Sequence, residues 1–186
     1  NSLTGNVRAM DQFIITEVAA LSVADFLSDK GADVRIKWPN DIYVRDRKIC
    51  GMLIENSLRG DEVATSIVGI GINLNQRDFP AELANPTSLA IATGKEIGPK
   101  EALEDFLPFF LTRLEMSLTP EGRAEMRNDY LDILYRKDKP FPYRDNVTGE
   151  EFTGTIKGIS DSGELLAEMP DKSIKSFSFK EIGYII

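Results

Sequence analysis

Histidine is missing from this sequence of 186 residues, and cysteine occurs once, at Cys50. Without histidine there can be no Ser/His or Cys/His nucleophilic pair, and no plausible zinc site. A single cysteine excludes an internal disulfide and fits a reducing compartment. No run approaches the ~20 consecutive apolar residues of a membrane helix, and the first residues show no signal-peptide pattern. These absences predict a cytoplasmic protein whose chemistry rests on lysine, arginine, carboxylates, amides and backbone groups, with or without magnesium.

Basic residues are outnumbered by acidic ones, with 22 Lys and Arg against 30 Asp and Glu, so the net charge is −8. A protein that neutralises many phosphates is therefore not expected, and we predict neither nucleic acid nor a membrane as partner. The hydrophobic fraction of 42% is that of an ordinary globular protein. This length fits one substantial domain, or one domain with a small appendage.

Hydrophobic spacing predicts three long helices, over residues 11–30, 99–118 and 121–136. In the second of these, leucine and phenylalanine repeat at three- and four-residue intervals, which predicts a core helix. The region between the first two helices holds β-rich runs and then a long surface loop. We expect strands at 34–37, 42–44, 48–55 and 63–72, a hairpin turn at 45–47, and a loop over 76–98 with a short helix at 88–93.

After Asp138 the pattern changes from helical spacing to short alternating runs. The segment Lys-Pro-Phe-Pro-Tyr, beginning at Lys139, leads into them. We expect strands near 151–157, 165–168, 174–179 and 183–186. About fifty residues of this kind predict a small β-barrel, so the expected domains are 1–138 and 139–186.

Residues 37–41, Lys-Trp-Pro-Asn-Asp, place a cation, the only tryptophan, an amide and a carboxylate within five positions between two expected strands. One interpretation is a tight turn with a solvated lysine and a locally bonded Asx side chain. The other is a phosphate-handling site in which Asp41 holds magnesium through oxygen. The spacing leaves both open.

Lys48 begins an apolar strand that contains Cys50, Gly51 and Leu53. A lysine at the edge of such a strand is usually surface decoration. A lysine whose stem is confined by packing can instead deliver its charge to a fixed point, and Gly51 would let a ligand approach the backbone. Cys50 is expected to be a small core residue rather than a nucleophile.

The run Gly-Ile-Gly-Ile-Asn-Leu-Asn at 69–75 lacks the third glycine of a dinucleotide-binding loop, because that position is Leu74. Its alternation places Gly69, Gly71, Asn73 and Asn75 on one face of a strand. A flat ligand lying across the strand would require such a face. The alternative is a strand that crosses a helix closely.

Taken together, the motifs at 37–41, 47–55 and 69–75 resemble the biotin–protein ligases, also called biotin–[acetyl-CoA-carboxylase] ligases. The resemblance extends to Thr87-Ser88-Leu89, the two helices after it and the terminal barrel, and so covers nearly all of the chain. It implies an α+β fold with a mixed β-sheet and packed helices, of the class II synthetase-like biotin ligase type. A small SH3-like β-barrel would follow.

The resemblance also implies a reaction in two steps. Biotin and ATP would give biotinyl-5′-adenylate and pyrophosphate, with Mg²⁺ as the metal. A lysine of a biotin carboxyl carrier protein would then take the biotinyl group as an amide. A homodimer would be compatible with the resemblance.

By the same resemblance, the catalytic residues are Lys48 and Asp41. The Lys48 ammonium would bridge the biotin carboxyl group and the α-phosphate, and Asp41 would hold the magnesium. The other implied ligand-binding residues are Lys37 as a neighbouring charge, Asn40 on the phosphate side, Gly51, Leu53, Gly69 and Gly71 against biotin, and Asn73 and Asn75 near the adenine and ribose.

One family motif is missing, since no Gly-Arg-Gly-Arg-x-Gly loop precedes the first helix. The opening Asn1-Ser2-Leu3-Thr4-Gly5 is expected to be the remnant of a strand that follows that loop, and no winged helix is visible. Two alternatives therefore stay open: a lipoate–protein ligase or octanoyltransferase-like enzyme of related fold, and a non-catalytic biotin-responsive regulator. The Lys-Trp-Pro-Asn-Asp run and the barrel favour biotin.

Overall fold

The computed structural model describes residues 7–186, which form two compact units. The first unit ends at Ile133, and the second comprises Leu134–Ile186. The strand expected over Asn1–Gly5 lies outside the described residues. The domain division expected after Asp138 stays a prediction. Within the described part, no helix is both long enough and apolar enough to cross a membrane.

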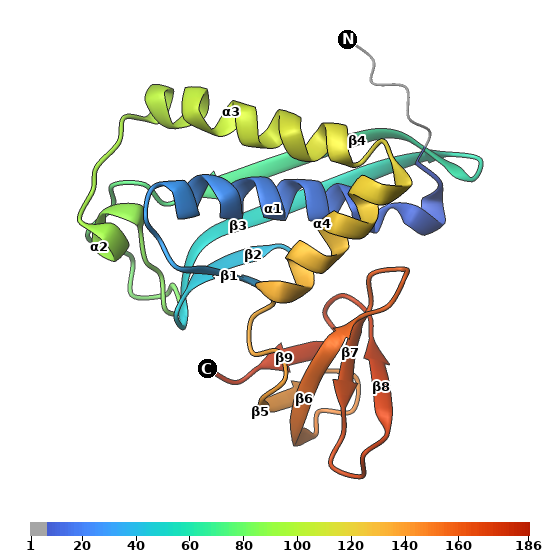
Figure 1. Cartoon of the computed structure of the whole chain (residues 1–186). Helices are drawn as coiled ribbons and strands as arrows, with labels where there is room; N and C mark the ends of the chain where they lie inside the picture. The colour runs from blue at the N-terminus through green and yellow to red at the C-terminus, as the bar shows by residue number, and fades with distance from the viewer. Residues whose placement is uncertain (1–6) are drawn as a thin grey trace. The chain divides into compact units, whose positions relative to one another are not determined.

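The first unit is built on a four-stranded antiparallel sheet whose strands follow chain order, β1-β2-β3-β4 (Figure 1). Short hairpins join β2 to β3 and β3 to β4, and Gly60 takes a left-handed conformation in the second hairpin, with φ +66°. All four expected strands are present, but β3 extends well past Glu55. Their bounds are β1 (Val34–Lys37), β2 (Asp41–Val44), β3 (Arg47–Arg59) and β4 (Glu62–Ile72).

Helices cover one face of this sheet (Figure 1). They are α1 (Phe13–Asp29), which follows the short 3-10 helix η1 (Ala9–Asp11), α3 (Pro99–Met116) and α4 (Pro120–Asp132), whereas the short helix α2 (Leu89–Thr93) lies at one end of the sheet. Helix α1 packs against α3, α4, β1 and β2, and Leu21, Phe26 and Leu27 in it are fully buried. The expected α+β class is therefore confirmed for this unit.

The prediction of a core helix for α3 is wrong. Only Ala102 of this helix is buried, whereas Leu103, Leu107 and Leu111 are 57, 45 and 53% exposed. Helix α3 packs mainly on α1 and α4. These two helices cover one strip of its surface, and the apolar stripe of α3 is wider than that strip. Helix α4 also ends earlier than expected, because Ile133 leaves the helical conformation.

Charged side chains join the helices to one another. The Arg113 guanidinium on α3 donates to Asp25 on α1 at 2.7 Å and to Asp129 on α4 at 2.5 Å. Arg127 on α4 donates to Glu17 on α1, whose side chain is 2% exposed. Burial raises the pKa of Glu17, and the hydrogen bond from Arg127 opposes that rise. The packing of α1 thus depends on a buried carboxylate that keeps its cationic partner.

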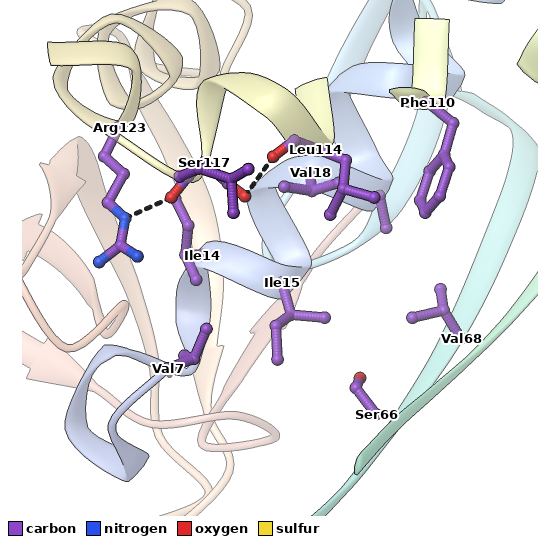
Figure 2. A pocket seen from close by; sticks show the side chains of 12 residues that line it. Val7, Ile14, Ile15, Val18, Ser66, Val68, Phe110, Leu114, Ser117 and Arg123 are labelled. Atoms are coloured by element: carbon purple, nitrogen blue, oxygen red, sulfur yellow. Dashed lines mark hydrogen bonds between the residues drawn. The ribbon is translucent and has the colours of Figure 1, made fainter. Parts of the chain in front are cut away.

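A cavity of about 250 Å³ lies between α1, α3 and β4 (Figure 2). Its lining is mostly apolar, and Figure 2 shows Val68 and Phe110 at its wall. Polar groups at one end are bonded locally: Ser117 Oγ donates to Leu114 O, and Arg123 Nε donates to Ser117 O, each at 2.6 Å. The helix layer is therefore incompletely packed against β4, and Ser66 Oγ at the cavity is buried with no hydrogen-bond partner among the described residues.

The second unit is a five-stranded antiparallel sheet of order β8-β7-β6-β5-β9, consistent with the expected small SH3-like barrel. Its core contains Tyr143, Ile156, Leu165 and Phe177, which are almost completely buried. The first strand was missed because it carries Pro140 and Pro142, residues that normally weaken a strand. The bounds are β5 (Pro140–Asp145), β6 (Glu151–Ile159), β7 (Leu165–Glu168), β8 (Ile174–Phe177) and β9 (Ile182–Tyr184).

We predict that Gly122→Ala destabilises the first unit by about 2–3 kcal/mol, because overpacking of a tight contact costs this much. A Cβ at Gly122 would lie 2.2 Å from the backbone oxygen of Met116, where α3 ends and α4 begins. Gly69→Ala is the control, since its Cβ would meet nothing closer than 3.8 Å. Urea unfolding followed by circular dichroism measures both, and equal stability of the two variants would contradict the account.

A second prediction concerns the buried pair of Glu17 and Arg127. Arg127→Met removes the hydrogen bond and the positive charge that lower the pKa of Glu17, while the burial that raises it remains. The pKa of Glu17 in the folded state therefore rises further above its ordinary value of 4.5. The folded state then binds a proton that the unfolded state releases, and stability falls as pH rises through that window. The loss relative to the wild type should reach about 3–5 kcal/mol at pH 8.

At pH 5 the same substitution should cost clearly less, because Glu17 can be neutral there. Arg77→Met is the matched control, since its ion pair with Glu96 is more than half exposed on both sides. Urea titrations at the two pH values give the comparison. An equal loss at pH 5 and pH 8 would show that the carboxylate does not titrate in this way.

Candidate functional site

The candidate site is centred on an ion pair between the first residue of β2 and the second residue of β3. Lys48 Nζ lies 2.8 Å from Asp41 Oδ1, and the two side chains are 40% and 24% exposed. A register shift between Ile42 and Tyr43 offsets the pairing of β2 with β3 at this point. The ammonium is thus held by a fixed carboxylate and is still accessible to a ligand.

The backbone of Lys48 is clamped by the segment that precedes α2. Its N–H donates to Asn85 O and its carbonyl accepts from Thr87 N, both at 2.9 Å. Asn73 Nδ2 in turn donates to Thr87 O at 3.0 Å. These bonds hold the base of the Lys48 side chain in place. Sequence reasoning missed this clamp, and the structure shows it together with the burial of Thr87 and Ser88 within the polar loop.

Glycines form an open floor beside the pair. Gly51 lies opposite Gly71 in the β3–β4 register, and Leu53 lies opposite Gly69. Leu53 is 64% exposed. Added Cβ atoms at Gly69 and Gly71 would make only ordinary contacts, at 3.8 and 3.6 Å. Sheet packing therefore does not require these two glycines.

The floor faces away from α1. Ser66 and Val68 alternate with the glycines along β4, and they line the cavity that Ile14 and Ile15 of α1 also line. Because side chains alternate across a strand, Gly69 and Gly71 belong to the opposite face. These two glycines therefore do not serve to let a helix cross the strand closely, which was the alternative that the sequence left open.

Gly51 differs from the other two glycines. A Cβ there would lie 2.9 Å from both Cε and Nζ of Lys48, and 3.5 Å from Asp41 Oδ1. The lysine side chain therefore lies directly over Gly51. The absence of a side chain at this position is what lets the ammonium reach the Asp41 carboxylate.

The turn between β1 and β2 is anchored from two sides. Pro39, which follows a cis peptide bond, accepts a hydrogen bond at its carbonyl from the Tyr130 hydroxyl on α4 at 2.7 Å. Asn40 Nδ2 donates to Met52 O on β3 at 3.1 Å. Trp38 is buried. These contacts support the turn that delivers Asp41.

Lys37, the neighbouring charge expected from sequence, lies at the end of β1 and pairs with Asp41 in the strand register. Its ammonium is 5.1 Å from the centre of the Tyr43 ring. The structure thus brings Lys37 near the pair by register, and gives its ammonium an aromatic neighbour. Its role toward a ligand stays a prediction.

Asn73 and Asn75 hold the long loop. Beyond the Asn73 bond to Thr87, Asn75 Nδ2 donates to Ile97 O at 2.8 Å, and Asn75 Oδ1 accepts from Ile97 N at 3.1 Å. The side-chain amide of Asn75 thus exchanges two hydrogen bonds with the backbone of Ile97, as the backbone of a neighbouring strand would. The expected role of both amides near adenine and ribose stays a prediction.

The described residues contain no group of three or more His, Cys, Asp and Glu side chains that could hold a metal ion. Magnesium commonly binds one or two protein carboxylates and completes its shell with phosphates and water. Asp41 fits that pattern as the protein's single ligand. Cys50 fits the expectation of a core residue, because burial raises its pKa to about 12 and keeps the thiol neutral.

An exposed cation, a carboxylate and a flat backbone floor suit a ligand that is partly planar and partly anionic. The cation can stabilise negative charge that develops on such a ligand. The glycines leave room for a flat group to lie against the strands. Lys48 and Asp41 are engaged with each other as an ion pair, so we expect the nucleophile to come from a substrate.

Family comparisons agree with these features. Residues 3–73 match the Biotin/lipoate A/B protein ligase family, and residues 146–182 match the Biotin protein ligase C terminal domain. A biotin–[acetyl-CoA-carboxylase] ligase of Paracoccus denitrificans is 34% identical over 160 residues, which are 82% of this chain and 65% of that protein. The bifunctional ligase/repressor BirA of Bacillus subtilis is 33% identical over 168 residues, covering 88% and 51%.

Solved structures of a biotin protein ligase are also similar to this chain. The biotin protein ligase of Aquifex aeolicus superposes with a TM-score of 0.75 at 28% identity, covering 94% of this chain and 75% of that one. The same ligase in complex with biotin and ATP gives 0.74 at 28% identity, covering 93% and 71%. The chain spans between about half and two thirds of the length of these two curated relatives.

We predict that Gly51→Ala displaces the Lys48 ammonium from Asp41 while the melting temperature hardly changes, because the clash is with the end of a flexible side chain. Freed from the ion pair, Lys48 should react with acetic anhydride up to about fivefold faster relative to Lys100, since a partly exposed pair contributes at most ~1 kcal/mol. Mass spectrometry of the acetylated peptides measures this. Gly71→Ala is the control, and an equal rate in both variants would contradict the geometry.

Proposed function

The chain belongs to the biotin protein ligase family, and from that premise we propose that it activates the carboxylate of biotin with ATP at the Lys48–Asp41 pair. The observation that carries the proposal is the 2.8 Å contact of Lys48 with Asp41 above Gly51. This contact holds one cation in a fixed position beside the open glycine floor. The biotin carboxylate and the α-phosphate of ATP, both anionic, would have to meet there. A ligand that binds there needs no histidine.

In the first step, an oxygen of the biotin carboxylate attacks the α-phosphorus of ATP. The bond from that phosphorus to the bridging oxygen breaks, and pyrophosphate leaves. Two anionic groups approach one another in this step, so a preorganised cation that contacts both stabilises the transition state. Lys48 takes this role, while Gly51, Leu53, Gly69 and Gly71 bound the biotin side of the site.

In the second step, an uncharged lysine amine of a biotin carboxyl carrier protein attacks the carbonyl carbon of the adenylate. The new C–N bond gives an amide, AMP leaves, and a proton is released from the amine. The carrier thus acts as the acceptor substrate. The names of the relatives as biotin–[acetyl-CoA-carboxylase] ligases support this choice of partner.

Magnesium would accompany ATP in the first step. Asp41 is the protein carboxylate that would hold it, and the phosphates and water would complete its shell. When bound, the ion would offset charge on the phosphates. Asn40 lies next to Asp41 in the anchored turn, which supports its place on the phosphate side.

A biotin substrate is favoured over a lipoate substrate by one observation. Residues 146–182 match a C-terminal domain that carries the name of biotin protein ligases, whereas the match over residues 3–73 covers biotin and lipoate enzymes alike. A biotin-responsive regulator remains the second candidate, because one relative is named as both ligase and repressor. A cytoplasmic location and a homodimer belong to the same proposal.

The experiment is biotin-dependent exchange of labelled pyrophosphate into ATP, with the protein as its gene encodes it. We predict that Lys48→Gln lowers the exchange rate about 10²–10³-fold, as expected for loss of one preorganised group that stabilises developing charge. Its melting temperature should be unchanged. Lys100→Gln removes the same charge from a side chain that is 89% exposed and should exchange at the wild-type rate.

Near wild-type exchange by folded Lys48→Gln would sink the assignment of Lys48. Biotin binding without any pyrophosphate exchange by the unsubstituted protein would favour the regulator instead. Calorimetric titration with biotin, and then with lipoate, distinguishes a biotin substrate from a lipoate substrate.

A further inference from the structure

A second cavity, of about 630 Å³, lies apart from the Lys48–Asp41 pair. Three segments form it: the link from α1 to β1, the β2–β3 turn with its flanking residues, and the second half of α2 with the residue before its cap. Small-molecule sites typically have volumes of ~300–1,000 Å³. The lining residues are Gly31, Asp33, Val44, Arg45, Asp46, Arg47, Thr87, Ile91 and Ala92. Neither Lys48 nor Asp41 nor any glycine of the floor is among them.

Two guanidinium groups of the cavity have no ion-pair partner in the part of the chain that the structure describes. Among residues 7–186, neither Arg45 nor Arg47 makes an ion pair or a side-chain hydrogen bond. The carboxylate of Asp33 is already engaged by Arg35 at 2.7 Å. The carboxylate of Asp46 also lines the cavity, so the lining holds two arginines and two aspartates. The two guanidinium groups thus remain available to bond an anionic group of a ligand.

A third cation lies near the Gly31 side of the cavity. Lys95 Nζ would be 3.5 Å from a Cβ built on Gly31, and it donates to Lys30 O at 3.2 Å. That partner is a neutral carbonyl, so the bond fixes the ammonium without cancelling its charge. Cationic groups near the cavity therefore come from the β2–β3 turn and from the loop after α2.

Thr87 adds a buried polar group to the same wall. It is 2% exposed, and its backbone N–H and carbonyl are bonded to Lys48 O and Asn73 Nδ2. No hydrogen bond among the described residues involves its hydroxyl. Because Thr87 lines the cavity, a ligand oxygen there can accept a hydrogen bond from its hydroxyl.

The rest of the wall is apolar. Val44, Ile91 and Ala92 line it, and Ile91 is 44% exposed. A free inorganic anion would leave these side chains in contact with water. A ligand with a hydrophobic body beside its anionic group would cover them, at a gain proportional to the apolar area buried.

We propose that this cavity binds a phosphate monoester. Its phosphate lies between Arg45 and Arg47, where guanidinium groups can bond phosphate oxygens in the planar, paired geometry they favour. The Thr87 hydroxyl donates to one of the same oxygens. An apolar or aromatic body packs on Val44 and Ile91. The site is separate from the adenylation site and does not rest on the proposed function.

The probes are phenyl phosphate, inorganic phosphate and benzoate, each titrated calorimetrically into the complete chain. Phenyl phosphate should bind more tightly than inorganic phosphate, because its ring covers the apolar wall, and more tightly than benzoate, because it offers three charged oxygens. The double variant Arg45→Gln with Arg47→Gln should weaken phenyl phosphate about tenfold or more. Thr87→Val, which replaces the hydroxyl by a methyl group of similar size, should weaken it about threefold to tenfold.

Two controls complete the design. Arg59→Gln removes the same charge at the far end of β3, outside the cavity, and should leave the affinity unchanged. Lys48→Gln should also leave it unchanged. Loss of binding in Lys48→Gln, with retention in the double arginine variant, would place the phosphate in the adenylation site and overturn the proposal. Equal affinity of phenyl phosphate, inorganic phosphate and benzoate would overturn the ligand class.

Discussion

The contact between the Lys48 ammonium and the Asp41 carboxylate sets the geometry of the candidate site. Several separate elements are needed to produce it. The anchored turn before β2 delivers Asp41, the loop before α2 clamps the backbone of Lys48, and the bare backbone of Gly51 leaves room for the lysine stem. A cation held in this way costs little further reorganisation when charge develops beside it, which is the basis of electrostatic catalysis.

The sheet divides its two faces between stability and binding. The face that carries Ser66 and Val68 turns toward α1, and α1 in turn relies on Arg113 and Arg127 to neutralise its carboxylates. The opposite face carries Gly69 and Gly71, with no packing demand on either residue. Because neighbouring residues of a strand point to opposite faces, one pair of strands serves both purposes.

Local patterns predicted much of this fold, and contacts between distant residues account for what was missed. The β-rich run at 34–37 predicted β1, and the short helix expected at 88–93 is α2, which the structure shows to be capped by Ser88 Oγ accepting from Ile91 N. The clamp of Asn75 on Ile97 joins residues 22 positions apart, and nothing in the short run around Asn75 specifies that partner. The leucines of α3 misled for a related reason, since periodicity shows which face is apolar but not what covers it. At the site, the motifs indicated Lys48 and Asp41, whereas the support from Thr87 needed the structure.

The most direct test of the account observes the Lys48 ammonium itself when ligand binds. The chain labelled with ¹⁵N-lysine is titrated with a non-hydrolysable analogue of biotinyl-5′-adenylate, and the Nζ resonance is assigned by its loss in Lys48→Gln. The account predicts that this resonance shifts on saturable binding and that its hydrogens exchange more slowly with water, because the ammonium then bonds the ligand's anionic groups. Saturable binding of the analogue with an unmoved Lys48 resonance would contradict it.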